Sequence, residues 1–185
     1  MEATHLFKSA RIRFAAMTEE AAASFSKWSE DPEYIRNLDT DIAFPRSEDS
    51  FRKEIQGGGG SLTSFELAIH MVLDDRLIGF AALHSIEWNN RAGRLAIGIG
   101  EKEDRNKGYG TEALQLLLQY AFYELNLHRV GLDVIGNNHS AIRCYEKVGF
   151  VVEGVIREGV LRDNQRVDRI YMGLLREEWE RNLKH

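Results

Sequence analysis

Two basic residues are followed by two glycines in the segment Arg105–Gly110, a pattern that could hold a phosphate group. The segment reads Arg-Asn-Lys-Gly-Tyr-Gly, so that Gly108 and Gly110 follow two cations. A glycine has no Cβ atom, which lets phosphate oxygens approach the backbone N–H groups closely. Arg105 and Lys107 would add positive charge. The residue types therefore predict the binding of an anion.

Two different hydrophobic periods flank this segment. Leu95, Ile97 and Ile99 alternate as in a strand, whereas the apolar residues from Leu114 to Leu125 recur at helical spacing. A turn between a strand and a helix presents unpaired N–H groups at the positive end of the helix dipole, which binds phosphate. We therefore expect a pyrophosphate site. A turn that only caps a helix is the alternative at this point.

Two common nucleotide motifs do not fit this region. Gly98–Glu103 begins like a dinucleotide-binding loop, but Glu103 stands in place of the third glycine and the helix starts later. The Gly-x-x-x-x-Gly-Lys-Ser/Thr loop is absent from the sequence. The bare positions Gly98 and Gly100 instead predict a bulge or the close approach of a ligand to the strand. A bend without any ligand is the alternative.

Composition excludes several classes of protein. The chain has 185 residues, 43% of them hydrophobic, and a formal net charge of −5, which argues against general binding to nucleic acid. No apolar run approaches the roughly 20 residues of a membrane span, and the first residues resemble no signal peptide. The single cysteine, Cys144, cannot form an internal disulfide. We expect one cytoplasmic domain over residues 1–185, with no metal site and no contact with a membrane.

The hydrophobic periods predict an alternation of strands and helices along the chain. Thr18 is expected to cap the first helix, Gly149 to end a later one, and Gly57–Gly60 to form a loop. The expected strands are Ile12–Phe14, Phe65–Met71, Leu77–Ile86, Leu95–Ile99, Val130–Val134, Phe150–Glu158 and Val167–Leu174. The expected helices are Thr18–Trp28, a short one from Pro32, Ser47–Ile55, Tyr109–Leu125, Asn138–Val148 and Glu177–Leu183.

This order of elements predicts an α/β fold with a mixed sheet. Three antiparallel strands precede the phosphate turn, and the strand–helix–strand unit that follows requires a crossover and hence one parallel pair. We expect about seven strands, mostly antiparallel, with helices on both faces.

Two blocks in this order resemble the GNAT superfamily of acetyl-coenzyme A-dependent N-acetyltransferases. The first is the strand Arg94–Gly100 followed by Arg105-x-x-Gly108-x-Gly110, which is similar to the superfamily's pyrophosphate loop. The second is Asn138-x-x-Ala141-x-x-x-Tyr145-Glu146-Lys147-x-Gly149-Phe150. From about Arg11 to Trp179 the chain looks most like the branch that includes the ribosomal-protein alanine acetyltransferases. The features similar to that branch are Trp28-x-x-Asp31-Pro32, His128-Arg129-Val130, Glu153-Gly154, Asp168 and Glu178-Trp179.

The resemblance implies that a primary amine attacks the thioester of acetyl-CoA, forms a tetrahedral oxyanion and expels a thiolate. It implies that the pantetheine arm lies along the strand that ends at Ile99, where a backbone N–H of Ile99 or Gly100 polarises the thioester carbonyl. Arg105 would act through its guanidinium or its backbone N–H. The residues expected to hold acetyl-CoA are Ile99, Gly100, Arg105, Asn106, Lys107, Gly108, Tyr109, Gly110, Thr111, Asn138 and Tyr145.

Tyr145 is the expected general acid. A tyrosine with a pKa near 10 stays protonated at pH 7 and can donate to the departing sulfur, whose thiol has a pKa of roughly 8.5. Ala141, Tyr145 and Val148 also form a helical stripe, so a core position is the alternative. The ribosomal-protein branch often has an aliphatic residue here, which puts a ribosomal substrate in doubt. Asn138 is expected to bond the pantetheine amides, to cap its helix, or to do both.

The acceptor side gives weaker signals. Cys144 is expected to be structural, and the general base stays open among Glu66, Glu87, His70 and His84. Between residues 30 and 49 there are seven acidic and two basic side chains, which would steer a cationic amine or form an ordinary acidic surface.

We expect an N-acetyltransferase that acts on a peptide N-terminus or a small amine. A catalytically silent acyl-CoA-binding module and a nucleotide-phosphate binder are the alternatives. A homodimer is compatible with the terminal strands and helices.

Overall fold

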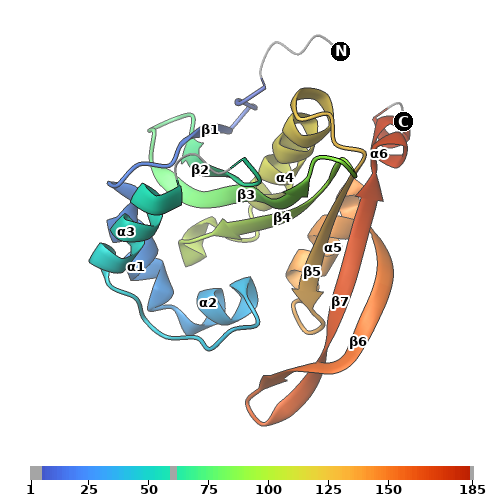
Figure 1. Ribbon diagram of the computed structural model, residues 1–185. Helices are drawn as coiled ribbons and strands as arrows, with labels where there is room; N and C mark the ends of the chain where they lie inside the picture. The colour runs from blue at the N-terminus through green and yellow to red at the C-terminus, as the bar shows by residue number, and fades with distance from the viewer. Residues whose placement is uncertain (1–5, 59–61, 184–185) are drawn as a thin grey trace.

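The computed structural model describes residues 6–58 and 62–183 of the chain as a mixed sheet covered by helices (Figure 1). The strand order is β1-β2-β3-β4-β5-β7-β6. The strands are β1 (Ile12–Ala16), β2 (Phe65–Met71), β3 (Leu77–Glu87), β4 (Ala92–Ile99), β5 (Arg129–Ile135), β6 (Val151–Arg162) and β7 (Gln165–Leu175). The helices are α1 (Ala21–Ser29), α2 (Pro32–Leu38), α3 (Glu48–Gly58), α4 (Tyr109–Gln119), α5 (His139–Val148) and α6 (Arg176–Asn182).

One parallel pair interrupts an otherwise antiparallel sheet, which confirms the predicted mixed topology. Strands β4 and β5 pair only from Ala92 with Arg129 to Arg94 with Gly131. Beyond Arg94 no pairing joins these two strands in the described residues, although β5 continues to Ile135. The edge of β4 that faces β5 is therefore open from Leu95 onward, directly before the turn that leads into α4.

Alternate residues of β3 face the two layers of helices. Ala81 and Leu83 are fully buried in the main core together with Leu117 of α4. Phe80 faces the other side, where its ring contacts Phe25 of α1 at a centroid distance of 6.0 Å. Helices α4 and α5 thus cover one face of the sheet, while α1, α2 and α3 cover the other (Figure 1).

Several predicted boundaries differ from those in the structure. The predicted helix Tyr109–Leu125 is α-helical only to Gln119 and continues as a π-helical turn over Tyr120–Glu124, and β6 extends to Arg162 instead of ending near Glu158. Helix α1 begins at Ala21 instead of Thr18, because the carbonyl of Thr18 accepts the Ala21 N–H in a preceding turn and its side chain makes no cap. Helix α3 runs through Gly58, beyond the predicted end at Ile55. A glycine in the last turn costs only about 1 kcal/mol, which the preceding turns offset. The rest of the expected loop, Gly59 and Gly60, lies outside the described residues.

Gly149 ends α5 as predicted, and other helix and strand ends also have local causes. Asp31 caps α2 by accepting hydrogen bonds from the N–H groups of Glu33 and Tyr34. Gly149 ends α5 in the left-handed conformation, with φ of 106°. The turn between β6 and β7 places Asp163 at a φ of 50° and the next residue at 60°, as a tight hairpin requires. Within the described residues, none of the helices is long and apolar enough to cross a bilayer.

Candidate active site

The turn before α4 presents a row of unpaired backbone donors. Gly108 has φ of 86° and Asn106 has φ of 60°, and these left-handed residues curl the backbone ahead of the helix. The N–H groups from Asn106 to Thr111 have no hydrogen-bond partner within the described residues. A concave run of free N–H groups at a helix N-terminus is an anion site. The geometry is the one that the sequence pattern predicts.

Side chains from elsewhere brace this turn from behind. The guanidinium of Arg11 donates to the carbonyl of Lys107 at 3.0 Å and forms an ion pair of 2.7 Å with Glu112. It also lies over the ring of Tyr109, 4.7 Å from its centroid. On the other side, the hydroxyl of Ser140 donates to Asn106 Oδ1 at 3.2 Å. The turn is therefore held in shape by protein contacts, with its N–H groups left over.

A cleft of about 450 Å³, here called the donor cleft, opens at this turn. It extends along the open edge of β4 and runs beside most of the length of α5. Predicted residues that line it are Ile99, Arg105, Asn106, Gly108, Gly110, Thr111, Asn138 and Tyr145. Predicted residues outside its lining are Gly100, Lys107 and Tyr109. The side chain of Lys107 is exposed, and that of Tyr109 supports the turn beneath Arg11.

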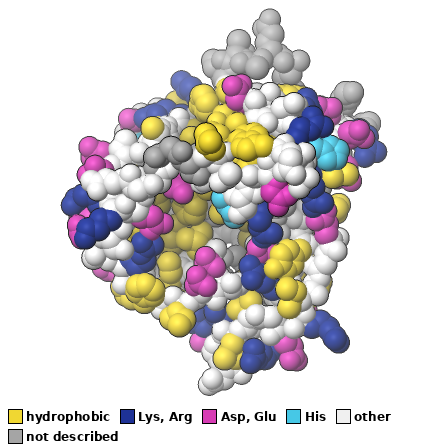
Figure 2. All heavy atoms as spheres, in the orientation of Figure 1, with side chains coloured by type: hydrophobic (Ala, Val, Ile, Leu, Met, Phe, Trp, Pro, Cys, Tyr) yellow, Lys and Arg dark blue, Asp and Glu magenta, His cyan; other side chains and the backbone are white. Residues whose placement is uncertain are grey.

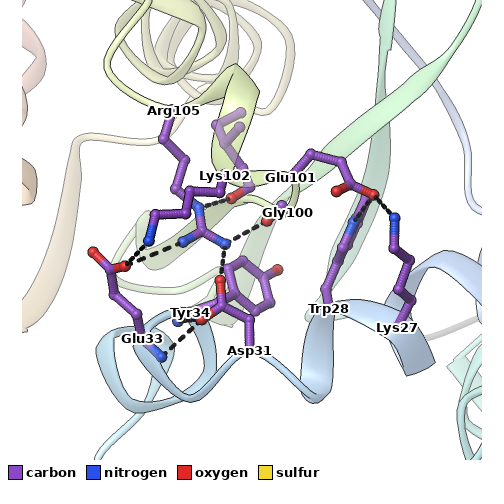
Figure 3. A network of polar contacts seen from close by, with 10 residues as sticks. Lys27, Trp28, Asp31, Glu33, Tyr34, Gly100, Glu101, Lys102 and Arg105 are labelled. Carbon is purple, nitrogen blue, oxygen red and sulfur yellow. Dashed lines mark hydrogen bonds and ion pairs between the residues drawn. The ribbon is translucent and has the colours of Figure 1, made fainter.

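Arg105 lines the donor cleft and is engaged by other parts of the chain (Figure 3). Its guanidinium donates to the carboxylate of Asp31 at 2.8 Å, to the carbonyl of Ile99 at 3.1 Å and to the carbonyl of Gly100. Its backbone N–H donates to the carbonyl of Lys102 at 3.2 Å. Both routes that the sequence suggested for Arg105 are thus occupied by the protein. Its contribution is to tie the turn to the N-terminus of α2.

Gly98 and Gly100 have a different reason for being glycine than the expected ligand. A Cβ atom on Gly100 would lie 2.0 Å from the ring of Trp28, and one on Gly98 would lie 2.8 Å from the Tyr34 hydroxyl and from the ring of Phe80. The bare face of β4 is therefore filled by aromatic side chains of the chain itself. The side of β4 that stays open is its edge facing β5.

Of the two backbone contacts expected on β4, Ile99 is the one that the geometry leaves open. The N–H of Gly100 donates to the carbonyl of Ile78 on β3 at 2.9 Å. Because successive N–H groups of a strand point to opposite edges, the N–H of Ile99 points toward the gap between β4 and β5. Gly100 is therefore unavailable, and Ile99 lines the donor cleft beside the turn.

Tyr145 lies in α5 at the wall of the donor cleft and is 9% exposed. Burial raises the pKa of its hydroxyl, with smaller contributions from Cys144 and Asp133, so the phenol keeps its proton. No hydrogen bond joins the hydroxyl to the described residues. Its ring also contacts the ring of Phe150 at a centroid distance of 5.9 Å, so Tyr145 belongs both to the core and to the wall of the cleft.

Three further predicted residues lie on the same cleft. The side chain of Asn138 accepts the N–H of Ala141 at 3.2 Å, which confirms its role as a helix cap. The hydroxyl of Thr111 lies 3.3 Å from the sulfur of Cys144. Burial raises the pKa of the Cys144 thiol, which keeps it protonated and weakens it as a nucleophile, in keeping with a structural cysteine.

Sequence reasoning assigned no role to two cations and a serine that face the donor cleft from α5. Ser140, Arg143 and Lys147 line the cleft and lie three or four residues apart, so they share one face of the helix. The two cations place positive charge across from the unpaired N–H groups of the turn. Their helical spacing next to Asn138 was the signal that could have revealed them.

A second cavity of about 700 Å³ lies on the face of the sheet covered by α1, α2 and α3, and it is called the aromatic cavity here. Its apolar wall includes the rings of Phe25, Phe51 and Phe80, and its lining also contains Tyr34 and Leu38, which the donor cleft shares. Figure 2 shows hydrophobic side chains within a hollow on this side of the molecule, with charged side chains around it. The charged or titratable residues that line the cavity are Asp39, Asp41, Arg46, Glu54, Glu66 and His84.

Only two of the four candidate general bases line the aromatic cavity. Glu66 and His84 line it, whereas His70 Nδ1 lies 2.8 Å from the carbonyl of Asp75 and the carboxylate of Glu87 accepts from the side chain of Asn90. Burial, followed by the charge of Arg94, lowers the pKa of His84, so its imidazole is neutral near pH 7.

The acidic side chains between residues 30 and 49 make different contacts. Asp39 and Asp41 line the aromatic cavity, while Asp31 holds Arg105. Glu48 and Asp49 form ion pairs within α3 instead. In the part of the chain that the structure describes, no group of three or more His, Cys, Asp or Glu side chains is arranged to hold a metal ion.

The family model described as "Acetyltransferase (GNAT) domain" matches residues 11–151. That range contains the turn, the open edge of β4 and Tyr145. The chain belongs to the GNAT acetyltransferase family. It is an acetyl-CoA-dependent N-acetyltransferase, and acetyl-CoA is its co-substrate.

GNAT relatives of more than one kind are similar to this chain. It is 32% identical over 140 residues to YdaF of Bacillus subtilis, named "Putative ribosomal N-acetyltransferase", which covers 74% of this chain and 75% of that protein. It is 26% identical over 168 residues to spermidine N(1)-acetyltransferase of Escherichia coli, covering 91% of this chain and 82% of that one. The solved structure of spermidine N-acetyltransferase from Vibrio cholerae, in complex with CoA and spermine, superposes with a TM-score of 0.84 at 21% identity, covering 93% and 99% of the two chains. The fold is therefore shared, and relatives with both ribosomal and polyamine names occur.

Proposed function

We propose that this enzyme transfers the acetyl group of acetyl-CoA to a primary amine that enters through the aromatic cavity. The observation that carries the proposal is the meeting of two cavities at Tyr34 and Leu38, on opposite sides of the end of β4. One cavity ends at a row of free N–H groups that suits a diphosphate. The other is rimmed by carboxylates that suit an amine. A donor and an acceptor that enter from these two sides would meet at β4.

The residues of the donor cleft divide the work of holding acetyl-CoA. The N–H groups of Asn106–Thr111 would bind the diphosphate, with Arg143 and Lys147 adding positive charge from α5. The pantetheine arm would lie along the open edge of β4, with the thioester carbonyl accepting the N–H of Ile99. This arrangement requires no metal ion, because the oxyanion is stabilised by hydrogen-bond donors.

Tyr145 would complete the transfer at the sulfur. As the amine nitrogen bonds to the carbonyl carbon, the carbon–sulfur bond breaks and negative charge develops on the thiolate. A buried phenol whose pKa is raised keeps its proton until that charge appears, and then donates a hydrogen bond or the proton to it. The free hydroxyl at the cleft wall supports this role.

The charges of the aromatic cavity favour a cationic acceptor. Arg46 forms an ion pair with Glu54, so these two charges offset each other. Asp39, Asp41 and Glu66 form no ion pair within the described residues, which leaves the cavity negative. Net negative charge raises the local concentration of a cationic amine. A polyamine and a basic peptide N-terminus both carry the positive charge that this cavity would attract, and the polyamine is the smaller of the two.

Thiol release from acetyl-CoA with a panel of amines tests the proposal. The panel contains spermidine, spermine, an amino sugar and a short peptide that begins with alanine. We expect turnover with at least one cationic amine well above hydrolysis. If acetyl-CoA binds and no amine exceeds hydrolysis, the chain is a binding module and the proposal fails. If the peptide alone reacts, the ribosomal-protein branch is the better description.

We also propose that two copies associate through the edge strand β6. Its side chains Val151, Val152, Val155 and Ile156 are each about half exposed, between 48% and 52%. An exposed apolar edge strand is otherwise prone to aggregate. Sedimentation equilibrium should show a dimer that Val155→Lys shifts toward monomer, and a wild-type monomer at all concentrations would contradict the proposal.

A further inference from the structure

Tyr34, in the middle of α2, has a buried hydroxyl with no partner. The residue is 8% exposed, and its hydroxyl oxygen is inaccessible to solvent and makes no hydrogen bond within the described residues. Buried polar groups in native proteins are nearly always hydrogen-bonded, so an orphan of this kind calls for an explanation. Tyr34 also lines both the donor cleft and the aromatic cavity.

The position of the ring is fixed from three directions (Figure 3). Asp31 caps the helix by accepting the Tyr34 N–H at 3.3 Å. The guanidinium of Arg105 lies 5.3 Å from the ring centroid, and the ring of Trp28 meets it edge-on at 6.2 Å. Arg105 also bonds the carbonyls at the end of β4, so one side chain connects Tyr34, α2 and the cofactor strand.

This fixed ring directs its hydroxyl at β4. The oxygen lies 2.8 Å from the place where a Cβ atom of Gly98 would be. Gly98 lines the donor cleft one residue before Ile99, whose N–H faces the gap where the thioester carbonyl is proposed to lie. The missing side chain at position 98 therefore leaves room for the hydroxyl beside the reacting end of the cofactor.

The hydroxyl keeps its proton there and is therefore able to donate a hydrogen bond. Burial raises the pKa of Tyr34, and the nearby Arg105 charge opposes this only in part, so the phenol is protonated throughout the working range. A protonated phenol that is buried without an acceptor is destabilising in the empty enzyme. An acceptor that exists only during the reaction would satisfy it, and that is how preorganised catalytic donors work.

We propose that Tyr34 is a catalytic residue whose hydroxyl donates a hydrogen bond to the oxyanion formed on the thioester carbonyl. The inference rests on the proposed acetyl transfer and adds a second donor opposite the N–H of Ile99. In the reaction the nitrogen–carbon bond forms, the carbon–sulfur bond breaks and one proton passes overall from nitrogen to sulfur. Tyr34 keeps its own proton throughout. It stabilises the oxyanion as that charge forms and collapses.

The test compares Tyr34→Phe with Tyr120→Phe, which removes the hydroxyl of a tyrosine outside both cavities. Thiol release is measured with the best amine and with water alone, because both acceptors generate the same oxyanion. We expect Tyr34→Phe to lower kcat with either acceptor by about 100-fold, as the loss of one oxyanion donor does. Its Kd for acetyl-CoA should be unchanged, and its melting temperature unchanged or higher. Tyr120→Phe should keep wild-type rates.

The outcomes separate this inference from the proposed function. A wild-type rate for Tyr34→Phe with both acceptors overturns the role of Tyr34 and leaves amine acetylation intact. A rate loss accompanied by a lower melting temperature and weaker acetyl-CoA binding also overturns it, because the hydroxyl would then be structural. If no amine reacts but hydrolysis falls 100-fold in Tyr34→Phe, the amine proposal fails and the oxyanion role stands.

Discussion

The donor cleft and the aromatic cavity meet at Tyr34, but they are built from different parts of the chain. The donor cleft depends on backbone: the free N–H groups of one turn and the open edge of one strand. The aromatic cavity depends on side chains contributed by α1, α2, α3, β2, β3 and β4. The first is local in sequence, whereas the second exists only after distant segments pack together.

This difference separates what each cavity specifies. A site made of backbone N–H groups recognises the diphosphate, which all acyl-CoA donors share. Such a site depends on its glycines and its shape and tolerates changes in its other side chains. A side-chain site is free to vary without disturbing the fold. Since the two sites are built from different parts of the chain, we expect that each can be damaged without the other.

Gly108→Val should cause the largest loss, and it should fall on the donor side alone. Gly108 lies in the phosphate turn with φ of 86°, so a Cβ atom crowds the phosphate and strains the backbone. We expect the Kd for acetyl-CoA to rise by about 1000-fold, roughly 4 kcal/mol, in isothermal titration. Gly149→Val is the control for backbone strain: it lies outside the cleft, its φ is 106°, and its Cβ atom would also lie 2.4 Å from the side-chain nitrogen of Asn182, so its strain is at least as large. Equal loss of binding in both variants would mean that strain, not the phosphate, is responsible.

Tyr145→Phe should separate chemistry from binding within the donor cleft. We expect kcat to fall by about 100-fold, within the range for general acid catalysis, while the Kd for acetyl-CoA stays near the wild-type value. Tyr123→Phe, at a tyrosine that is 42% exposed and outside both cavities, should change neither. An unchanged single-turnover rate in Tyr145→Phe would remove this residue from the mechanism.

Substitution of a cavity carboxylate should affect only the acceptor. Glu66→Gln removes a charge that has no ion pair within the described residues, and we expect the KM of a cationic amine to rise by about fivefold, about 1 kcal/mol, at low salt. The effect should shrink as salt screens the charge. Asp49→Asn, which breaks an ion pair with Lys53 on the outside of α3, is the control. A KM change that is insensitive to salt would argue against electrostatic attraction.

Substitution of His84 should give the smallest effect, and this effect should be on the stability of the fold. Its pKa is lowered in the folded enzyme from the ordinary value of 6.5, so the unfolded chain binds the proton more readily in acid. The stability that neutral His84 contributes to the folded state is present above pH 6.5, and it is lost as the pH falls from there through the pKa of the folded enzyme. His84→Gln should therefore flatten the decline of melting temperature as the pH falls below about 6.5. An identical slope in both proteins would show that His84 does not titrate in this window.

Sequence reasoning succeeded where the chemistry is local. The Arg105–Gly110 turn, the parallel pair and the Asn138 cap all depend on neighbours within a few residues or on a strand–helix–strand order that allows few topologies. It did not foresee the contact of Arg105 with Asp31 or that of Gly100 with Trp28, because these partners are more than 70 positions away. A comparable separation in sequence hid the relation of Tyr34 to Gly98.

A crystal structure with CoA and the preferred amine shows whether the turn before α4 holds the diphosphate. We expect the diphosphate oxygens to accept hydrogen bonds of about 2.9 Å from the N–H groups of Asn106–Thr111. We also expect Arg105 to keep its bonds to Asp31 and the amine to lie in the aromatic cavity. A diphosphate bound away from the turn, or held by an Arg105 that has left Asp31, would overturn this assignment of the two cavities.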